Sequence, residues 1–458
     1  MKSEKSMIRD YTEGPLTRQL LTFAGPFMLS NLLQNAYNLV DMAVVGRFVG
    51  AAGLSAVSIG ADLIHLYTFV AMGFCNAGQV IISQYVGLRD RRSVSKIVGV
   101  MFTFILGLSL MITAGALAGT GLWLRLLNVP EEALSLCRGY TVCCTAGLFF
   151  IFGYTMISSI LRGMGDSRRP LLFIAIASVL NVVLDLVLVG AGMGAFGAAL
   201  ATVIAQGASF GVSVVYLWRH KHELGFDFSP RDLIPDTANL RLLIKMGVPM
   251  MIQSIAISVS ALFVSSRINA YGVTASAVTG VGTKLSMVAS IVTLALSAAG
   301  ATMVGQNFAA RKFDRVRKTI TDSFLIGSAF AAVLSLGIIL WPEQVFSVFN
   351  SDPEVLAMSH AYVLIAVLNY FGWACRGPSI ALCNGMGFPM LNFALGIFDG
   401  VVMRIGLCVL MGDVLGMGIR GYWIGSALAG YAFFLIMFPY FLSGRWKNHR
   451  PPTVRTAA

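Results

Sequence analysis

The chain is 458 residues long, with 57% hydrophobic residues, 12% charged residues and a mean hydropathy of +0.77. Ordinary soluble domains carry about twice that share of charge, so the composition excludes a soluble globular protein and indicates a polytopic helical membrane protein. Its main surroundings are then the lipid bilayer, and the net charge of +12 does not indicate a nucleic-acid partner. The seven cysteines lack CxxC spacing and indicate neither a disulfide framework nor a metal site.

Twelve apolar segments are long enough to cross a bilayer as helices, which takes about 20 residues each. They predict an all-α fold of twelve transmembrane helices. The segments are 18–46, 52–80, 94–120, 133–161, 169–190, 195–218, 240–266, 274–304, 318–341, 355–384, 388–411 and 419–443.

The first predicted span carries an unusual polar stripe. Gln34, Asn38 and Asp41 are spaced by four and three residues and therefore share one helical face. A stripe that ends in a carboxylate is unfavourable in lipid and normally faces a bundle interior or a water-filled cavity. Gly25-Pro26 lies in the first half of the span, where proline removes a backbone donor. We interpret this helix as a moving, ion-binding wall with a hinge at Gly25 and Pro26.

Lysines and arginines gather in alternate loops and set the predicted orientation. Most of the 33 basic residues lie before the first span, in the loops after the second, fourth, sixth and eighth spans, and after the twelfth. The positive-inside rule assigns that side, with both termini, to the cytoplasm. The net positive charge is therefore a topology signal.

The second half of the chain repeats the first. Gln84 and Gln306 open similar basic loops 222 residues apart, SQYVGLRDRRSVSK and GQNFAARKFDRVRK, and Pro26 pairs with Pro249. Six spans per half give two parallel halves, which in transporters usually flank the substrate path. The predicted division is an N-terminal six-helix bundle at 1–218, a cytoplasmic linker at 219–240 and a C-terminal six-helix bundle at 241–458.

The repeat, the opening TEGPLTRQLLTFAGPFMLSNLLQNAYNLVDMAVVGRFVG and the loop LRGMGDSRRP resemble the multidrug and toxic compound extrusion (MATE) family, in its MepA- and DinF-like bacterial branch. The resemblance covers nearly the whole chain. It implies two pseudo-symmetric six-helix bundles in a V shape in the cytoplasmic membrane of a bacterium. It also implies an antiporter that exports organic cations or drugs by alternating access, driven by inward H+ or Na+. No further cofactor is expected, and we expect a monomer.

The resemblance also implies a cation-coupling site in the N-terminal half. Its relatives carry an aspartate on the first helix, an Asn-xxx-Asp on the fifth and a threonine on the sixth, which match Asp41, Asn181, Asp185 and Thr202. These residues would ligate Na+ if the transporter is sodium-coupled. The carboxylates that another branch uses in its C-terminal half have no counterpart here, because the seventh span has no acid and the tenth carries Arg376.

Helix geometry supports the same grouping. Asp185 lies about 16 residues, or roughly 24 Å, above the start of its span, and Thr202 lies roughly 10 Å below the start of the returning span. Asn181 is one turn below Asp185 on the same face. Carboxylates, an amide and a hydroxyl at one depth form an all-oxygen site that suits a hard cation, and neighbouring carboxylates in low dielectric also tend to share a proton.

Other polar residues are candidates for the substrate pathway. Gln34, Tyr37 and Asn38 line the first span, and Tyr37 is either a platform for a flat cation or a core residue. Asp62 corresponds to Lys284 at the 222-residue offset, and isolated buried charges usually pair.

The sequence allows several alternative ion pairs among these charged residues. Asp62 can pair with Lys284 across the halves, or Asp399 can pair with Arg404 or Lys284 within the second half. These charges, together with Arg376, either gate transport or only neutralise one another.

The residues alone allow two other classes of function, a flippase and a channel. A flippase-like exporter of a lipid-linked or peptide substrate would keep the same helical repeat, and dye efflux would distinguish it. A channel has less need of paired carboxylates in one half. An enzyme is not expected, because no nucleophile–base pair, HExxH motif or Walker loop occurs.

Overall fold

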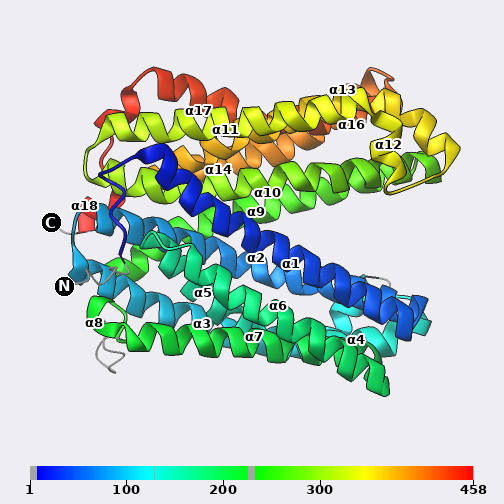
Figure 1. Ribbon diagram of the computed structural model, residues 1–458, viewed down its shortest axis with the longest axis horizontal. Coiled ribbons are helices and arrows are strands. Elements are labelled where there is room, and N and C mark those ends of the chain that lie inside the picture. The colour runs from blue at the N-terminus through cyan, green and yellow to red at the C-terminus, as the bar shows by residue number, and fades with distance from the viewer. Residues whose placement is uncertain (1–7, 128, 225–232, 457–458) are drawn as a thin grey trace. The chain divides into compact units, whose positions relative to one another are not determined.

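The computed structural model describes residues 8–127, 129–224 and 233–456. Every regular element in these ranges is a helix, which confirms the predicted all-helical fold (Figure 1). Residues 225–232 of the predicted linker lie outside the described ranges.

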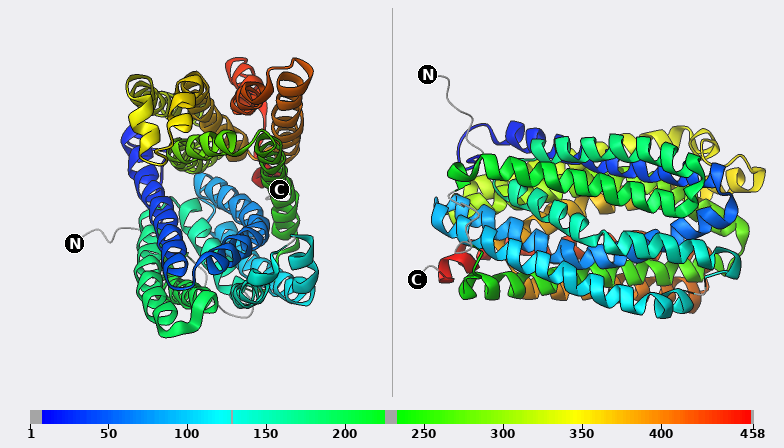
Figure 2. Two further views of the ribbon diagram at one scale, coloured as in Figure 1. Left: turned by 90° about the vertical axis from the view of Figure 1, so that its right-hand side faces the viewer. Right: turned by 90° about the horizontal axis from the view of Figure 1, so that it is seen from below.

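The chain divides into two compact units. Unit 1 holds Gly25–Met251 and the described residues before Tyr11, and unit 2 holds Tyr11–Ala24 and the residues from Ile252 onwards. Figure 2 shows that, within each unit, the long helices run roughly along a common direction.

Unit 1 is built from the helices of the first half of the chain. They are α2 (Ala51–Gly87), α3 (Arg91–Leu126), α4 (Glu131–Ala146), α5 (Leu148–Gly163), α6 (Arg168–Leu188), the π-helical turn η1 (Val189–Met193), α7 (Gly194–Arg219) and α8 (Lys221–Leu224).

Unit 2 is built from the helices of the second half. They are α10 (Val273–Ala309), α11 (Phe313–Leu340), α12 (Pro342–Ser347), α13 (Pro353–Met386), α14 (Pro389–Ile397), the π-helical segment η2 (Phe398–Gly406), α15 (Leu407–Val409), η3 (Leu410–Val414), α16 (Gly418–Ala429), α17 (Ala432–Leu442), η4 (Arg445–Asn448) and α18 (Pro452–Thr456).

Two long helices, α1 (Leu16–Phe48) and α9 (Thr237–Asn269), are shared between the units. The first nine residues of α1 belong to unit 2 and the rest, from Gly25, to unit 1; α9 belongs to unit 1 up to Met251 and to unit 2 beyond it. Each of these helices contains a proline near its division, Pro26 in α1 and Pro249 in α9. Each unit therefore contains a short segment from the other half of the chain, whereas the predicted bundles 1–218 and 241–458 are continuous in sequence.

The membrane-spanning helices match the predicted pattern. Nine stretches in the described residues are long and apolar enough to span a bilayer, and the pair α4–α5, bent by 47°, makes ten. One stretch, Arg168–Arg219, contains two antiparallel helices, because η1 leaves helical geometry at Gly192 (φ 88°) and α7 returns along α6. Counting α6 and α7 separately, and adding the more polar α1, gives twelve spans.

The internal repeat is visible in the helix ends. Helices α2 and α10 are both 37 residues long. Each follows a glycine with positive φ, Gly50 (83°) or Gly272 (104°), a backbone conformation that residues with a Cβ rarely adopt. Arg89 and Arg311, 222 residues apart, share the same left-handed φ of 58° just after these helices.

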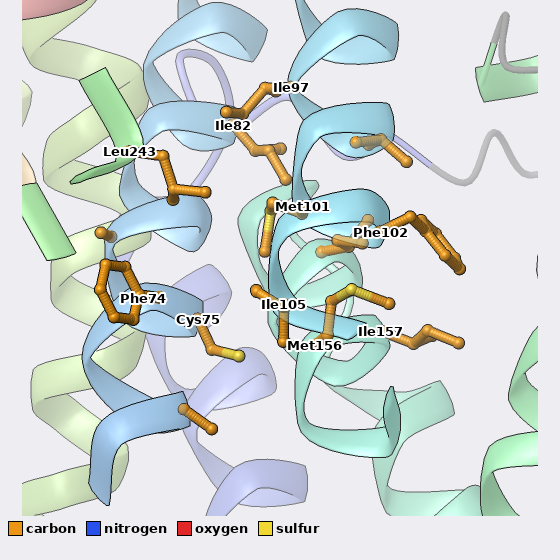
Figure 3. Close-up of a cluster of buried hydrophobic side chains, with 14 of the residues drawn as sticks. Phe74, Cys75, Ile82, Ile97, Met101, Phe102, Ile105, Met156, Ile157 and Leu243 are labelled. Carbon is orange, nitrogen blue, oxygen red and sulfur yellow. The ribbon is translucent and has the colours of Figure 1, made fainter. Parts of the chain in front are cut away.

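The main core of unit 1 lies between α2, α3 and α5. Figure 3 shows Phe74 and Ile82 of α2 with Met101 and Ile105 of α3 in this core, and Leu243 of α9 beside them. Because residues 237–251 of α9 bury side chains here, this end of α9 is part of the unit 1 core.

Candidate functional site

Asp41 lies on the part of α1 that belongs to unit 1, and its side chain is only 6% exposed. The buried face of α1 here carries Tyr37, Asp41 and Val45, at spacings of four. Gln34 is exposed and Asn38 is half-buried. The predicted polar stripe therefore turns its carboxylate into unit 1, while Gln34 stays at the surface.

Asn181 and Asp185 lie one turn apart on α6, and both are buried. Because α7 returns antiparallel to α6, Thr202 reaches the same level, and the Asn181 Nδ2 donates a hydrogen bond to the Thr202 Oγ1 at 3.3 Å. The depth argument from the sequence thus places these two side chains together correctly. Asp41 and Asp185 are close enough for their carboxylates to interact electrostatically.

Four oxygens of this group have no hydrogen-bond donor within the described part of the chain. Asp41 Oδ1, Asn181 Oδ1 and both carboxylate oxygens of Asp185 are buried without a hydrogen-bond partner among the residues that the structure describes. Buried acceptors are almost always satisfied in folded proteins, and an unpaired buried carboxylate is particularly costly. The observation fits a bound cation or proton, because either supplies the missing partner. We name Asp41, Asn181, Asp185 and Thr202 the oxygen cluster.

Three neighbours of the oxygen cluster were not identified from the sequence. Tyr140 and Cys144 of α4 lie within electrostatic reach of Asp41. Gln206 lies one turn beyond Thr202 on α7; its Nε2 donates to the Tyr37 hydroxyl at 3.4 Å, while its buried Oε1 has no partner among the described residues. A glutamine four residues after the threonine, in an otherwise apolar span, was the available signal for this residue.

Tyr37 itself is a core residue in this structure. It packs in a cluster with Ile174, Ala177 and Ala205. The residue is 8% exposed.

The amino-acid sequence matches a known protein family. The MatE family model matches residues 26–187 and again residues 249–410. The chain belongs to the MatE family. The two matches start 223 residues apart, at Pro26 and Pro249, so the internal repeat consists of two MatE units. Members of this family are transporters, so the protein is a membrane transporter rather than an enzyme.

Relatives and solved structures agree with this assignment. The chain is 29% identical to "Probable multidrug resistance protein YoeA" of Bacillus subtilis over 93% of each chain. It is also 29% identical to "Probable multidrug resistance protein YpnP" of the same organism, over 96% of this chain and 97% of that protein. A solved multidrug resistance MATE family transporter in an outward-facing conformation matches the fold with a TM-score of 0.87 at 22% identity, covering 98% of this chain and 99% of that one.

The second MatE unit has a buried cluster of charged side chains that includes two arginines. Arg404, which takes the place of Asp185 when Pro389 is aligned with Pro170, lies 3.5 Å from Asp399, and Arg376 of α13 lies 2.5 Å from the same carboxylate. Asp399 is fully buried and lies in the π-helical segment η2. We name Arg376, Asp399 and Arg404 the charged triad. One of the predicted pairings, Asp399 with Arg404, is present, and Arg376 is a partner that the sequence argument did not name.

Asp62 and Lys284 lie on different units. Asp62 is exposed on α2 of unit 1, and Lys284 is exposed on α10 of unit 2. Within the described part of unit 2, Lys284 forms no ion pair with Asp399; its ammonium lies 5.6 Å from the centre of the Phe349 ring. Their pairing with each other stays a prediction.

Proposed function

We propose that this protein is a cation-coupled antiporter that exports organic cations or drugs across the cytoplasmic membrane of a bacterium by alternating access, driven by H+ or Na+. The observation that carries the proposal is the set of unsatisfied oxygens on Asp41, Asn181 and Asp185. A channel or a passive carrier has no need for two carboxylates without partners in one unit. The names of the relatives as multidrug resistance proteins support drugs as the exported class.

Coupling follows from competition for negative charge. With the oxygen cluster empty, Asp41 and Asp185 attract an organic cation and repel each other. An entering H+ or Na+ removes both effects, since its charge is held by the Asp41, Asn181, Asp185 and Thr202 oxygens. A change in affinity of one ligand caused by the other is reciprocal, so the drug is released as the ion is taken up.

Helix α1 is the element that carries this change. Its outer part holds Asp41 in unit 1, while Leu16–Ala24 belongs to unit 2, and the division falls at Gly25-Pro26. Proline lacks the N–H that would bond to the preceding turn, so the helix bends most easily there. A repacking of α1 around Asp41 then acts on unit 2 through the same helix.

The start of α1 is held tightly in unit 2. Arg315 donates to the carbonyls of Tyr11 (2.8 Å) and Gly14 (3.0 Å) and to the Gln19 Oε1 (3.2 Å). The Thr17 hydroxyl donates to Asp322 at 2.6 Å. We name residues 11–24 the strap. The firmly bound strap lies directly before the hinge at Gly25-Pro26, and this arrangement supports the transmission of movement along α1 to unit 2.

The proposed orientation has both termini and the basic loops in the cytoplasm. The proposed substrates are small organic cations, the proposed assembly is a monomer, and the only cofactor is the coupling ion.

Transport in proteoliposomes with separately imposed gradients tests this function. We expect saturable uptake of a fluorescent organic cation that requires one ion gradient, H+ or Na+, and that stops when that gradient is collapsed. Uptake that is unchanged without either gradient would contradict coupling. Conductance that does not saturate with substrate would indicate a channel.

A further inference from the structure

Unit 2 contains a partly open cavity of about 130 Å³ between α11, α13 and α17. These three helices are labelled in the upper part of Figure 1. Pro378 and Ser379 of α13 form the floor, Phe324 of α11 forms one wall, and Phe434 and Phe438 of α17 form the other. We name this cavity the α11–α17 groove.

The groove offers an apolar surface. The Ser379 hydroxyl, its most deeply placed polar group, already donates to the Cys375 carbonyl at 2.9 Å. The Phe324 and Phe434 rings stack with centroids 6.0 Å apart, and Phe434 stacks on Phe438 at 4.6 Å. Thr321 and Phe438 are exposed, so the groove opens at these two side chains. An occupant therefore gains by burying apolar area and needs few polar groups inside.

One end of the groove carries a basic residue that has no partner. Four of the five basic residues between 311 and 318 are engaged: Arg311 with the Phe313 ring, Lys312 and Arg315 with the strap, and Lys318 with Asp322. Among these five, only Arg317 has neither an ion pair, nor a side-chain hydrogen bond, nor a ring contact within the described residues, and it is exposed.

Arg317 also lies on the groove face of α11. It precedes Ile320 by three residues, Thr321 by four and Phe324 by seven, and these spacings place all four on one side of the helix. At the same end, Phe441 of the groove stacks on Trp446 with centroids 6.0 Å apart, and Arg445 is exposed beside it. Trp446 is buried in the core of unit 2, so the exposed Arg445 is the group at this end that can reach the level of the lipid headgroups, where arginines at span ends are typical.

We propose that the α11–α17 groove binds one anionic phospholipid, with part of an acyl chain in the groove and the headgroup phosphate on Arg317 and Arg445. Basic pockets between transmembrane helices are known sites for anionic headgroups. A drug-like cation is the poorer occupant, because Arg317 and Arg445 make one end of the groove positively charged. The site lies wholly in unit 2 and is separate from the oxygen cluster, so it does not depend on the proposed transport mechanism.

Lipid retention measured by native mass spectrometry tests this proposal. The full-length protein is purified in detergent, delipidated and incubated with an equimolar mixture of phosphatidylglycerol and phosphatidylcholine that have the same acyl chains. We expect one phosphatidylglycerol to be retained in preference to phosphatidylcholine. Arg317→Ala should weaken its retention about fivefold, and Thr321→Trp, which narrows the opening, should lower retention of both lipids at this site.

Two matched variants control for nonspecific loss of charge and for misfolding. Arg92→Ala removes an exposed basic residue at the start of α3 in unit 1 and should retain phosphatidylglycerol like the wild type. Thr321→Ser preserves the opening and should do the same, which separates blocking from misfolding. Equal retention of the two lipids by the wild type would overturn the proposal, as would an equal loss in the Arg92→Ala and Arg317→Ala proteins.

Discussion

Two different buried clusters of charged and polar side chains distinguish the two MatE units at the level of residues. In unit 1, the oxygen cluster has carboxylates without donors. In unit 2, Asp399 has two arginines within 3.5 Å. The guanidinium of Arg376 also lies 5.6 Å from the rings of both Trp373 and Phe433, where cation–π attraction adds to the ion pair. Unit 2 therefore supplies its own cations, and for this reason the proposed coupling ion is assigned to unit 1.

Removing the carboxylate of the charged triad should destabilise unit 2. Asp399→Ala leaves Arg376 and Arg404 buried without a counter-charge, and breaking a buried ion pair in this way costs about 3–5 kcal/mol. We expect a clearly lower thermal unfolding temperature in detergent and poor recovery of monodisperse protein. Glu343→Ala is the control, because both side chains of the His360–Glu343 pair are exposed and such a pair contributes little. Equal stability of the two variants would show that the triad is not a stabilising unit.

The exchange of helix ends between the units is the main feature at the level of elements. The strap buries Tyr11, Leu16, Leu20 and Phe23 in unit 2. The first part of α9 is held in unit 1 in a related way: the Tyr85 hydroxyl of α2 donates to the Asn239 Oδ1 at 2.8 Å. Each exchanged end precedes a proline in its helix, which allows the bound end and the remainder to change their relative direction.

Weakening the strap should slow transport without changing substrate affinity. Arg315→Ala removes the charged donor that binds the Tyr11 and Gly14 carbonyls and Gln19, and such bonds contribute about 1.5–3 kcal/mol each when buried and less where, as here, they are partly exposed. We expect a several-fold lower transport rate and an unchanged dissociation constant for the substrate, measured by uptake and by fluorescence titration. Arg91→Ala, at an exposed position in unit 1, is the control. A variant with wild-type turnover would contradict the role of the strap.

At the level of the whole molecule, much of the fold was predictable from the sequence and part of it was not. The twelve spans follow from apolar length, and the Asn181–Thr202 contact follows from the fixed rise of two helices joined at Gly192. The exchange of residues 11–24 and 237–251 was not predictable, because apolar periodicity does not state which bundle a helix end joins. Arg376 was not named as the partner of Asp399, because the sequence does not fix which faces of the consecutive helices α13 and α14–η2 meet.

The predicted pairing of Asp62 with Lys284 joins the two units, so it is a prediction about the transport cycle. If the charges meet in one state, neutralising either one alone should impair transport. The exchange Asp62→Lys with Lys284→Asp should then recover part of the activity, since the two changes are not additive for interacting residues. Uptake by the two single variants and the double variant measures this. Losses in the double variant equal to the sum of the two single losses would instead assign each charge a separate role.

The coupling role of the oxygen cluster is the central claim, and charge-neutral replacement of its carboxylates tests it most directly. Asp41→Asn and Asp185→Asn keep the side-chain shape but remove the negative charge that the ion and the organic cation both use. Uptake of a fluorescent organic cation into proteoliposomes under an imposed H+ or Na+ gradient is measured for each variant, with Asp314→Asn, an exposed carboxylate at the start of α11, as control. We expect both cluster variants to insert normally and to lose accumulation against the gradient, while the control accumulates like the wild type. Accumulation by Asp41→Asn protein at the wild-type rate would contradict the account.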